Sequence, residues 1–579
     1  MNTRFIIKKF LIFFVILISF SADAQDMEEI YGDIKKVFKE KPFKISGGFS
    51  SNLNYNLNNG GIDRRALPFR FQAVANFNIS LYSKVSIPLN INYSNGGFLY
   101  NYKLPAYSFV GLSPSYKWGT LHLGNRSMNF SQYTLSGHSF YGIGTELTPG
   151  KLRVSAMYGR LRRAIEEDAG SIQNIEPAYK RMGTGIKVGY DFGGDKIALI
   201  FFKGWDDLNS VSAFSDSLNI KPNDNAIISV QGTKSFGKIV SLDFDFAQSA
   251  FNNNTRSERL IEEKNTTLFK TIGGTFTPRA ATQYSTAIKT SLNFKLLKGN
   301  LGINHERVGP GYRTLGALFF ENDYENFTGS VASPFLKGKV NVNANAGVQR
   351  NDIRNNKTNA SLRFIGSVSL NISLNEKWNV NTNYSNFRNT NRQRAISVPF
   401  IQVDSIILTQ VNQNINFSTS YKANESSAFS LMMGYQKSNS IENDEVLRDR
   451  DNTNLVGNVS HSYTVKDKKF ALTSSFLISK GTLNDSDILS LSPTLSLSKP
   501  IFNDKVKSSF TLSYVSLTDD GVKINDLMTF RSSFALSLSK KHSFAMNVGG
   551  IYRNAKNSVT AKPQFFESTG GISYRWVLK

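Results

Sequence analysis

The stretch Ser136-Gly137-His138-Ser139 places serine hydroxyls beside a histidine, the residue types that nucleophilic hydrolysis uses. A working site needs a base within hydrogen-bond reach of the nucleophile, and a third group that orients the base. Neighbouring residues of a strand point to opposite faces, so Ser139 and His138 do not meet on a strand. We therefore interpret the stretch as a polar junction between a loop and a strand, and predict no enzymatic activity.

The other histidines do not suggest a metal site. His122, His305, His461 and His542 are dispersed along the chain without the spacing of metal ligands. The chain has no cysteine, which excludes disulfides, thiolate metal sites and a cysteine nucleophile. Acidic clusters such as Asp206-Asp207 fall in expected long loops, where they either bind divalent cations or are solvated charge. We predict no cofactor and no resident metal.

The elements that carry these residues begin with a secretory signal, predicted at residues 1–24. Basic residues precede an apolar core from Phe10 to Phe20, and Ala22-Asp23-Ala24 is a small-residue cleavage pattern. This predicts export through the Sec pathway. Residues 25–43 follow with apolar side chains at helical spacing among charges, which predicts a short periplasmic amphipathic helix.

From residue 44 onward, apolar and polar residues alternate in one stretch after another. Between Ser361 and Leu374 the apolar residues, Phe364 and Val368 among them, share one parity, while Ser, Asn and Arg fill most of the other. A period of two means that one strand face meets an apolar medium and the other meets water. The polar parity is rich in Asn, Ser, Gly and Arg, which is typical of a wet interior.

Short turns and longer polar loops alternate between these stretches. Twelve short turns, most with Gly, Asn or Asp, recur about every 42 residues and are separated by thirteen longer loops. These connections join about 26 strands, with a range of 24–28. Short turns at one end and long loops at the other are typical of outer-membrane barrels. We therefore predict an all-β fold, in which residues 44–579 form a single large antiparallel transmembrane β-barrel. A soluble propeller explains the spacing poorly, because its blades contain four short strands.

The basic excess of the chain, a formal net charge of +24, suits two interpretations once the protein is exported. A cationic lumen would attract anionic solutes, whereas a basic rim would face anionic lipid headgroups; an exported barrel has little access to nucleic acid, and we predict no nucleic-acid partner. Four arginines on the polar parity of their strands are predicted to face the lumen: Arg153, Arg363, Arg531 and Arg575. They either select solutes or pair with lumen carboxylates such as Asp243 and Asp245 and hold loops in place.

The tryptophans support a membrane barrel by their positions. Three of them adjoin short turns or the C-terminus, and one lies at the opposite end of its strand, which predicts aromatic girdles at the two membrane interfaces. These girdle residues are Trp118, Trp205, Trp378 and Trp576.

Two stretches, Leu123 to Phe140 and Pro177 to Asp207, together with the Ala-Asp-Ala-Gln signal end, resemble the large outer-membrane β-barrel proteins of the Bacteroidota. The resemblance implies a compartment and a fold more than an activity. We expect no globular N-terminal plug like that of TonB-dependent transporters, since only residues 25–43 precede the predicted barrel after the signal. The chain also lacks the N-terminal domain and the cysteines of a lipopolysaccharide-inserting barrel.

Three functions follow as hypotheses. The first is a porin-like channel or transporter of the outer membrane, with a basic polar lumen constricted by loops. The second is a non-transporting barrel of a larger envelope machine for protein secretion or outer-membrane assembly, and the third is an outer-membrane hydrolase. The expected partners are outer-membrane lipid or lipopolysaccharide and a periplasmic or outer-membrane protein.

Overall fold

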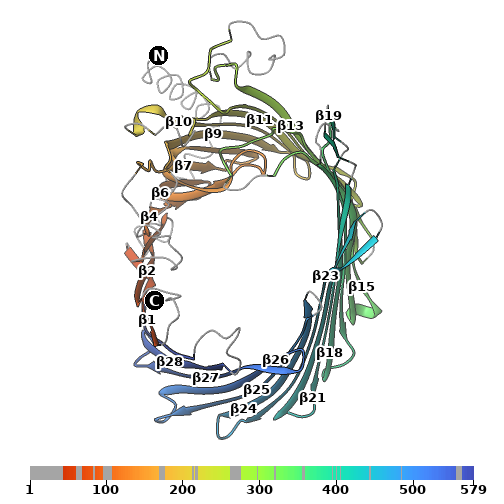
Figure 1. Cartoon of the computed structure of the whole chain (residues 1–579). Helices are drawn as coiled ribbons and strands as arrows, with labels where there is room; N and C mark the ends of the chain where they lie inside the picture. The colour runs from red at the N-terminus through yellow and green to blue at the C-terminus, as the bar shows by residue number, and fades with distance from the viewer. Residues whose placement is uncertain are drawn as a thin grey trace.

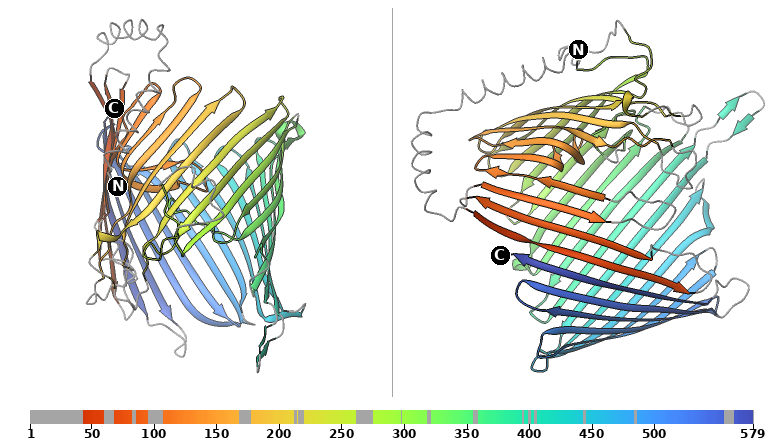
Figure 2. Two further views of the ribbon diagram at one scale, coloured as in Figure 1. Left: turned by 90° about the horizontal axis from the view of Figure 1, so that it is seen from above. Right: turned by 90° about the vertical axis from the view of Figure 1, so that its left-hand side faces the viewer.

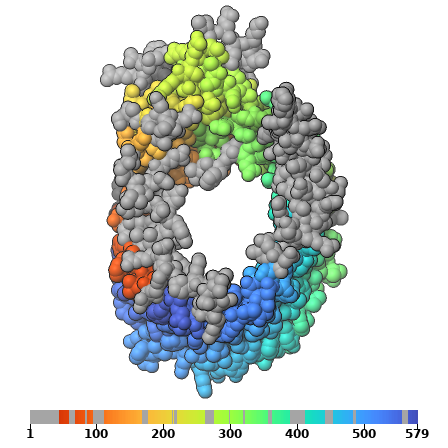
Figure 3. Space-filling view, in the orientation of Figure 1, coloured from red at the N-terminus to blue at the C-terminus, as the bar shows by residue number. Residues whose placement is uncertain are grey.

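In the computed structural model, a ring of strands surrounds a central opening (Figures 1 and 3). The described residues are 43–59, 68–81, 85–94, 107–167, 177–211, 214, 220–260, 275–296, 298–317, 321–354, 359–393, 396–398, 401–403, 406–442, 445–483, 486–555 and 564–578. The predicted signal segment and almost all of the predicted N-terminal helix, residues 25–43, lie outside this part of the chain.

Consecutive strands of the ring pair in antiparallel fashion, and they are strongly tilted (Figure 2). The first part of the wall is formed by β1 (Phe43–Asn59), β2 (Phe69–Leu81), β3 (Val85–Ser94), β4 (Tyr107–Leu112), β5 (Ser115–Tyr116), β6 (Gly119–Asn129), β7 (Ser136–Leu147), β8 (Leu152–Arg162), β9 (Lys180–Asp191), β10 (Lys196–Asp207), β11 (Asp224–Phe236), β12 (Val240–Asn252), β13 (Thr282–Lys295), β14 (Asn300–Val308) and β15 (Tyr324–Phe335). The second part is formed by β16 (Val340–Asn351), β17 (Asn359–Ser373), β18 (Trp378–Gln393), β21 (Ile406–Lys422), β22 (Ser427–Glu442), β23 (Glu445–Val465), β24 (Phe470–Leu483), β25 (Ser486–Ile501), β26 (Val506–Asp519), β27 (Val522–Ser537), β28 (His542–Ala555) and β29 (Phe565–Leu578).

The ring closes because the first strand pairs with the last. The register of β1 against β29 runs from Gly47 opposite Leu578 to Asn59 opposite Phe566. β4 and β5 are two pieces of one strand, since both pair with β3 and with β6. The break falls at Pro114, which has no backbone N–H to give to a ladder.

The barrel therefore has 26 strands, as the turn count predicts. A separate hairpin of β19 (Ile396–Val398) and β20 (Ile401–Val403) lies outside the ring sheet. Short 3-10 helices also occur at η1 (Leu208–Ser210) and η3 (Leu336–Gly338). Among the described residues, no helix has the length and apolar character needed to cross a membrane.

One face of the sheet is apolar all the way round. Cross-strand partners share a face, and Phe327 is opposite Val348, which in turn is opposite Phe364. These three side chains, like Leu199 of β10, are exposed although large and apolar. A closed barrel has only an inner and an outer face, so a continuous exposed apolar face is the one that meets lipid in a membrane barrel.

The connections alternate between short and long along β1 to β21, but not throughout the chain. The prediction of thirteen longer loops is wrong in the C-terminal half, where β22 and β23, β24 and β25, and β26 and β27 are each joined by only two residues. Asp520 and Gly521 both have positive φ, 46° and 79°. This Asp-Gly pair suits the tight turn whose twist matches a hairpin. The polar residues assigned to loops there belong to longer strands instead.

Candidate functional site

The principal built feature of the polar face is a connection that folds back into the ring. Residues 130–135, between β6 and β7, lie inside the wall as an orange loop in Figure 1. Tyr133 and Leu135 are fully buried, and Phe130 is 2% exposed. They pack with Phe140, Met157, Ile200 and other residues of β7 to β14 into an apolar cluster. An apolar core thus forms on the inner surface of one sector of the barrel.

A second connection, residues 309–317 after β14, interlocks with the first. The Tyr312 hydroxyl donates to the Tyr133 carbonyl at 2.8 Å, and the Thr314 hydroxyl donates to the Thr134 carbonyl at 2.6 Å. The backbone N–H of Ser136 donates to the Gly316 carbonyl at 3.0 Å. A Cβ at Gly316 would lie 2.5 Å from the Thr134 carbonyl oxygen, so only glycine permits this approach. We call residues 130–135 and 309–317 together the inner shelf.

Side chains of the barrel wall form hydrogen bonds to the backbone of the second connection. The Asn225 amide nitrogen donates to the Arg313 carbonyl at 3.3 Å, and its Oδ1 accepts from the Leu315 N–H at 3.1 Å. The Ser249 hydroxyl also donates to the Arg313 carbonyl, at 2.7 Å. Asn225 and Ser249 are buried, and a buried amide that satisfies both its donor and its acceptor fixes a single geometry. The shelf is therefore anchored to β11 and β12.

Glu306 of β14 is the polar centre of the shelf. Its Oε1 accepts three hydrogen bonds, from Gln132 Nε2 at 2.6 Å, from the Tyr133 hydroxyl at 2.8 Å and from the Tyr324 hydroxyl at 3.0 Å. Burial and the Glu306 charge raise the pKa of Tyr133 above its ordinary value. The Tyr133 hydroxyl therefore stays a donor to the carboxylate at neutral pH.

Two lysines of the wall form hydrogen bonds to the first connection, residues 130–135. Lys187 Nζ of β9 donates to the Phe130 carbonyl at 2.8 Å, and Lys289 Nζ of β13 donates to Gln132 Oε1 at 3.0 Å. These two lysines, which the sequence analysis did not single out, hold the loop against the wall.

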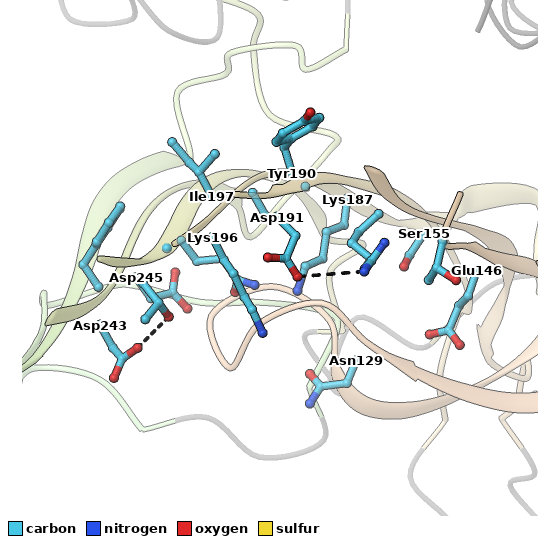
Figure 4. A pocket seen from close by; sticks show the side chains of 18 of the residues that line it. Asn129, Glu146, Ser155, Lys187, Tyr190, Asp191, Lys196, Ile197, Asp243 and Asp245 are labelled. Carbon is cyan, nitrogen blue, oxygen red and sulfur yellow. Dashed lines mark hydrogen bonds and ion pairs between the residues drawn. The ribbon is translucent and has the colours of Figure 1, made fainter. Parts of the chain in front are cut away.

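Beside the shelf, the polar face forms a cavity of about 640 Å³. In Figure 4, Lys187, Asp191 and Glu146 point into this space, whereas Tyr190 and Ile197 lie on the other side of the ribbon. Its charged lining is balanced between four basic and four acidic side chains: Arg153, Lys187, Lys196, Lys289, Glu146, Asp191, Asp243 and Asp245. The cavity is polar but not cationic.

The four arginines predicted to face the lumen lie on separate parts of the wall. Arg153 is among the cavity residues and has Asp191 as its ion-pair partner, at 3.8 Å, rather than Asp243 or Asp245. Arg363 Nη1 donates to Gln349 at 3.4 Å, and its guanidinium lies 5.6 Å from the Phe387 ring centre. The remaining two pair across the sheet with small residues: Arg531 with Thr511 and Gly549, and Arg575 with Ser50 and Ser543.

The four tryptophans lie at or near strand ends. Trp118 occupies the connection between β5 and β6, Trp378 begins β18, and Trp205 and Trp576 are the third residue from the end of β10 and of β29 respectively. Trp378 stacks near Tyr421 with ring centres 4.6 Å apart, and Trp576 meets Phe77 at 6.1 Å. The girdle assignment itself stays a prediction.

The histidine of the Ser136 to Ser139 stretch has a structural contact. His138 is 9% exposed, and its Nδ1 lies 2.7 Å from the Ser139 carbonyl oxygen. A different contact chain has the residue types of a hydrolase: Ser113 Oγ lies 2.8 Å from His122 Nδ1, and His122 Nε2 lies 3.4 Å from Glu146 Oε2. The His–Glu contact is longer than a strong charge-assisted bond.

The acidic pair that suggested a cation site is engaged by basic side chains. Asp206 accepts from Arg181 Nε at 2.8 Å and from Arg181 Nη2 at 3.0 Å, and Asp207 pairs with Lys180 at 2.6 Å. In the described part of the chain, no group of three or more His, Asp or Glu residues is arranged to hold a metal ion. The oxygens of Asp206 therefore serve the wall rather than a cation.

Sequence reasoning expected loops to constrict the lumen, but it did not identify the residues that form the inner shelf. The alternation rule treats residues 130–135 and 309–317 as solvent loops, because neither stretch has a helical or a strand period. One signal was present: Phe130, Tyr133 and Leu135 are large and apolar in a connection of six residues. Such residues in a short loop indicate burial rather than solvent exposure.

The fold defines the class: a large closed β-barrel like those of bacterial outer-membrane proteins. No protein-family model matches the sequence, and no curated protein is similar to it. Similar solved structures include the translocation pore of the P pilus usher PapC, at 12% identity over 92% of this chain and 99% of that chain, with a TM-score of 0.36. The ferric preacinetobactin receptor BauA of Acinetobacter baumannii is 10% identical over 92% of this chain and 80% of that chain, with a TM-score of 0.36. The FrpB iron transporter of Neisseria meningitidis is 11% identical over 93% of this chain and 83% of that chain, with a TM-score of 0.37. None is similar enough to assign an activity to this chain.

Proposed function

We propose that the chain is an outer-membrane channel or transporter whose polar inner face conducts hydrophilic solutes. The supporting observation is the continuous polar face opposite the apolar one, around an opening that the inner shelf narrows from one sector (Figure 3). Barrels of 16–18 strands enclose an aqueous channel, and a 26-strand barrel encloses a wider one. Export through the Sec pathway and origin in the Bacteroidota remain part of this proposal from the sequence alone.

Solute selection in this proposal depends on the polar-face arginines. Arg531 and Arg575 pair across the sheet with small residues, Thr511, Gly549, Ser50 and Ser543, which leave room for a solute near each guanidinium. The cavity beside the shelf has balanced charge, so it would favour zwitterionic or polar solutes rather than simple anions. We therefore propose weak anion preference for the pore as a whole.

Planar-bilayer conductance of the purified protein tests the proposal. We expect stable ion-conducting steps with a reversal potential that indicates anion preference. Replacing Arg531 and Arg575 by Gln should shift the reversal potential toward cations. Arg160→Gln, which removes a guanidinium 5.1 Å from the Tyr141 ring centre on the apolar face, is the matched control and should leave it unchanged. A silent protein under all conditions would contradict a channel.

The width of the opening favours a second candidate, the barrel of a larger envelope machine for secretion or outer-membrane assembly. In the part of the chain that the structure describes, the shelf packs on the β7 to β15 sector and does not cross the opening. A pore this wide would compromise the envelope unless a further segment or a partner fills it. A protein that is silent in bilayers and is purified from membranes in stoichiometric complex with other envelope proteins would favour this candidate.

A further inference from the structure

Lysine is concentrated at one end of the barrel, in the short connections. Eleven short connections are described, from the one between β5 and β6 to the one between β27 and β28. Each has a lysine within it or at a residue that directly adjoins it. With one flanking residue on either side, they contain sixteen lysines, six acidic residues and no arginine. We call these connections the lysine ring. Their lysine side chains are all exposed.

The opposite end of the barrel does not share this excess. Its described connections and strand ends mix both signs, with Asp206 engaged by Arg181, Asp207 by Lys180 and Glu325 by Arg350. In the lysine ring some pairs also occur, such as Lys466 with Glu425 and Lys469 with Asp504, but lysines outnumber the acids. Much of the chain's basic excess is therefore located on one rim.

Large apolar side chains project from the same connections. Phe502 is 74% exposed and Leu336 72%, the highest values among the exposed large apolar residues of the described chain. Phe192, Ile239 and Leu538 of these connections are 60–62% exposed, as is Phe69 at the start of β2, at the opposite end of the barrel. A turn in water has no reason to expose such groups beside lysines. At a membrane surface the pairing is favourable, because the apolar group enters the acyl boundary while the lysine reaches the headgroups.

We propose that the lysine ring binds anionic phospholipid headgroups of the leaflet that borders the short-turn end. The charge is complementary to phosphate, and each ammonium near an anionic surface favours binding by about fivefold. In the described chain the ring extends from β5 to β28 rather than over one sector, which suits a lipid annulus better than a docked protein. This inference does not depend on whether the barrel conducts solutes.

Reconstitution into nanodiscs with equal amounts of phosphatidylglycerol and phosphatidylcholine of identical acyl chains tests the proposal. Native mass spectrometry of the lipids retained on the protein should show phosphatidylglycerol enriched several-fold. The enrichment should fall as salt rises from 0.05 to 0.5 M, since screening shortens the reach of exposed charges.

Variants separate charge from a general effect on folding. Replacing Lys468, Lys469, Lys540 and Lys541 by Gln should reduce the enrichment at least threefold, while the same four positions changed to Arg should keep it. The matched control changes four lysines near the other end to Gln: Lys221, Lys437, Lys480 and Lys523. It should retain the enrichment of the unmodified protein.

The apolar part of the ring has its own test. Phe502→Ser together with Leu336→Ser should lower retention of both lipids alike, without changing their ratio. Equal retention of the two lipids by the unmodified protein would overturn the proposal. So would an enrichment that survives the lysine-to-glutamine changes, or cross-linking that finds a protein seated around the ring in native membranes.

Discussion

Glu306→Gln should loosen the inner shelf without unfolding the barrel. The change keeps the size of the side chain and one carbonyl oxygen, but it removes the charge that three donors share: Gln132, Tyr133 and Tyr324. A hydrogen bond to a charged group stabilises by about 1 kcal/mol more than a neutral one. Two of these donors, Gln132 and Tyr133, belong to the shelf, so the change gives a loss of about 2 kcal/mol in the free energy that keeps residues 130–135 against the wall.

Amide hydrogen exchange measures this loss directly. The N–H groups of Phe130, Thr134 and Ser136 are bonded to the carbonyls of Leu135, Ser131 and Gly316, so they exchange only when the shelf opens. A loss of about 2 kcal/mol should accelerate their exchange by about 30-fold, since 1.4 kcal/mol corresponds to a factor of ten. Amides of β24 and β25, on the far side of the ring, should exchange at an unchanged rate.

The matched control is Glu325→Gln on the neighbouring strand. Glu325 is also a carboxylate with several donors, from His305 and Arg350, but it lies on the opposite face from the shelf. This variant should leave the exchange of Phe130, Thr134 and Ser136 unaltered. If Glu306→Gln leaves their protection intact, or if Glu325→Gln reduces it equally, then Glu306 does not anchor the shelf.

Four further predictions concern the shelf, the wall and the chemistry. Gly316→Ala should release the two connections from one another, because its Cβ would lie 2.5 Å from the Thr134 carbonyl oxygen; faster exchange of the Ser136 amide checks this, and unchanged exchange would contradict the close approach. Burial raises the pKa of both Tyr133 and Tyr312. The shelf should therefore keep its full stability below about pH 10, the ordinary tyrosine pKa, and lose stability at higher pH. Ultraviolet titration combined with exchange measurements detects this, and ionisation of both tyrosines at pH 10 would refute it. Cysteines at Asn52 and Ser573, which are opposite one another across β1 and β29, should form a disulfide that shifts mobility on an unreduced gel, whereas cysteines at Asn52 and Thr511 should not. A fluorophosphonate probe should leave Ser113 unlabelled, because the His122–Glu146 contact of 3.4 Å is too long to orient and charge the histidine strongly. Labelling abolished by Ser113→Ala and by His122→Ala would instead establish a hydrolase.

The barrel was predictable because its physics is local and repeated. Alternation with a period of two identifies each strand, and glycine, asparagine or aspartate marks most of the turns. The stretch from Ser361 to Leu374 predicted a strand with one apolar face, and β17 has Leu362, Phe364 and Val368 exposed on one side. Counting turns of this kind was enough to give 26 strands. Loop lengths near residues 443, 484 and 520 were misjudged because polar residues at the end of a long strand resemble a loop.

The shelf was not predictable in this way because its contacts join distant parts of the chain. Gln132 and Tyr133 meet Glu306, and Tyr312 meets Tyr133, across more than 170 residues. No periodicity connects such residues, and a single sequence contains no other measure of their proximity. Glu306 was an unremarked polar residue of a strand, yet it is the acceptor that the shelf is built around.

Closure between β1 and β29 has a consequence for how the protein is made. The two edges that must meet are separated by more than 500 residues, so the open edge of Phe43–Asn59 exists from the moment it is synthesised until the last strand arrives. An unpaired edge with an apolar face is a template for wrong pairing, and contacts so distant in sequence form slowly. The final seam is thus the step at which the nascent sheet most needs protection from other copies of itself, and a sequence change that weakens β29 would act on biogenesis before it affected the mature barrel.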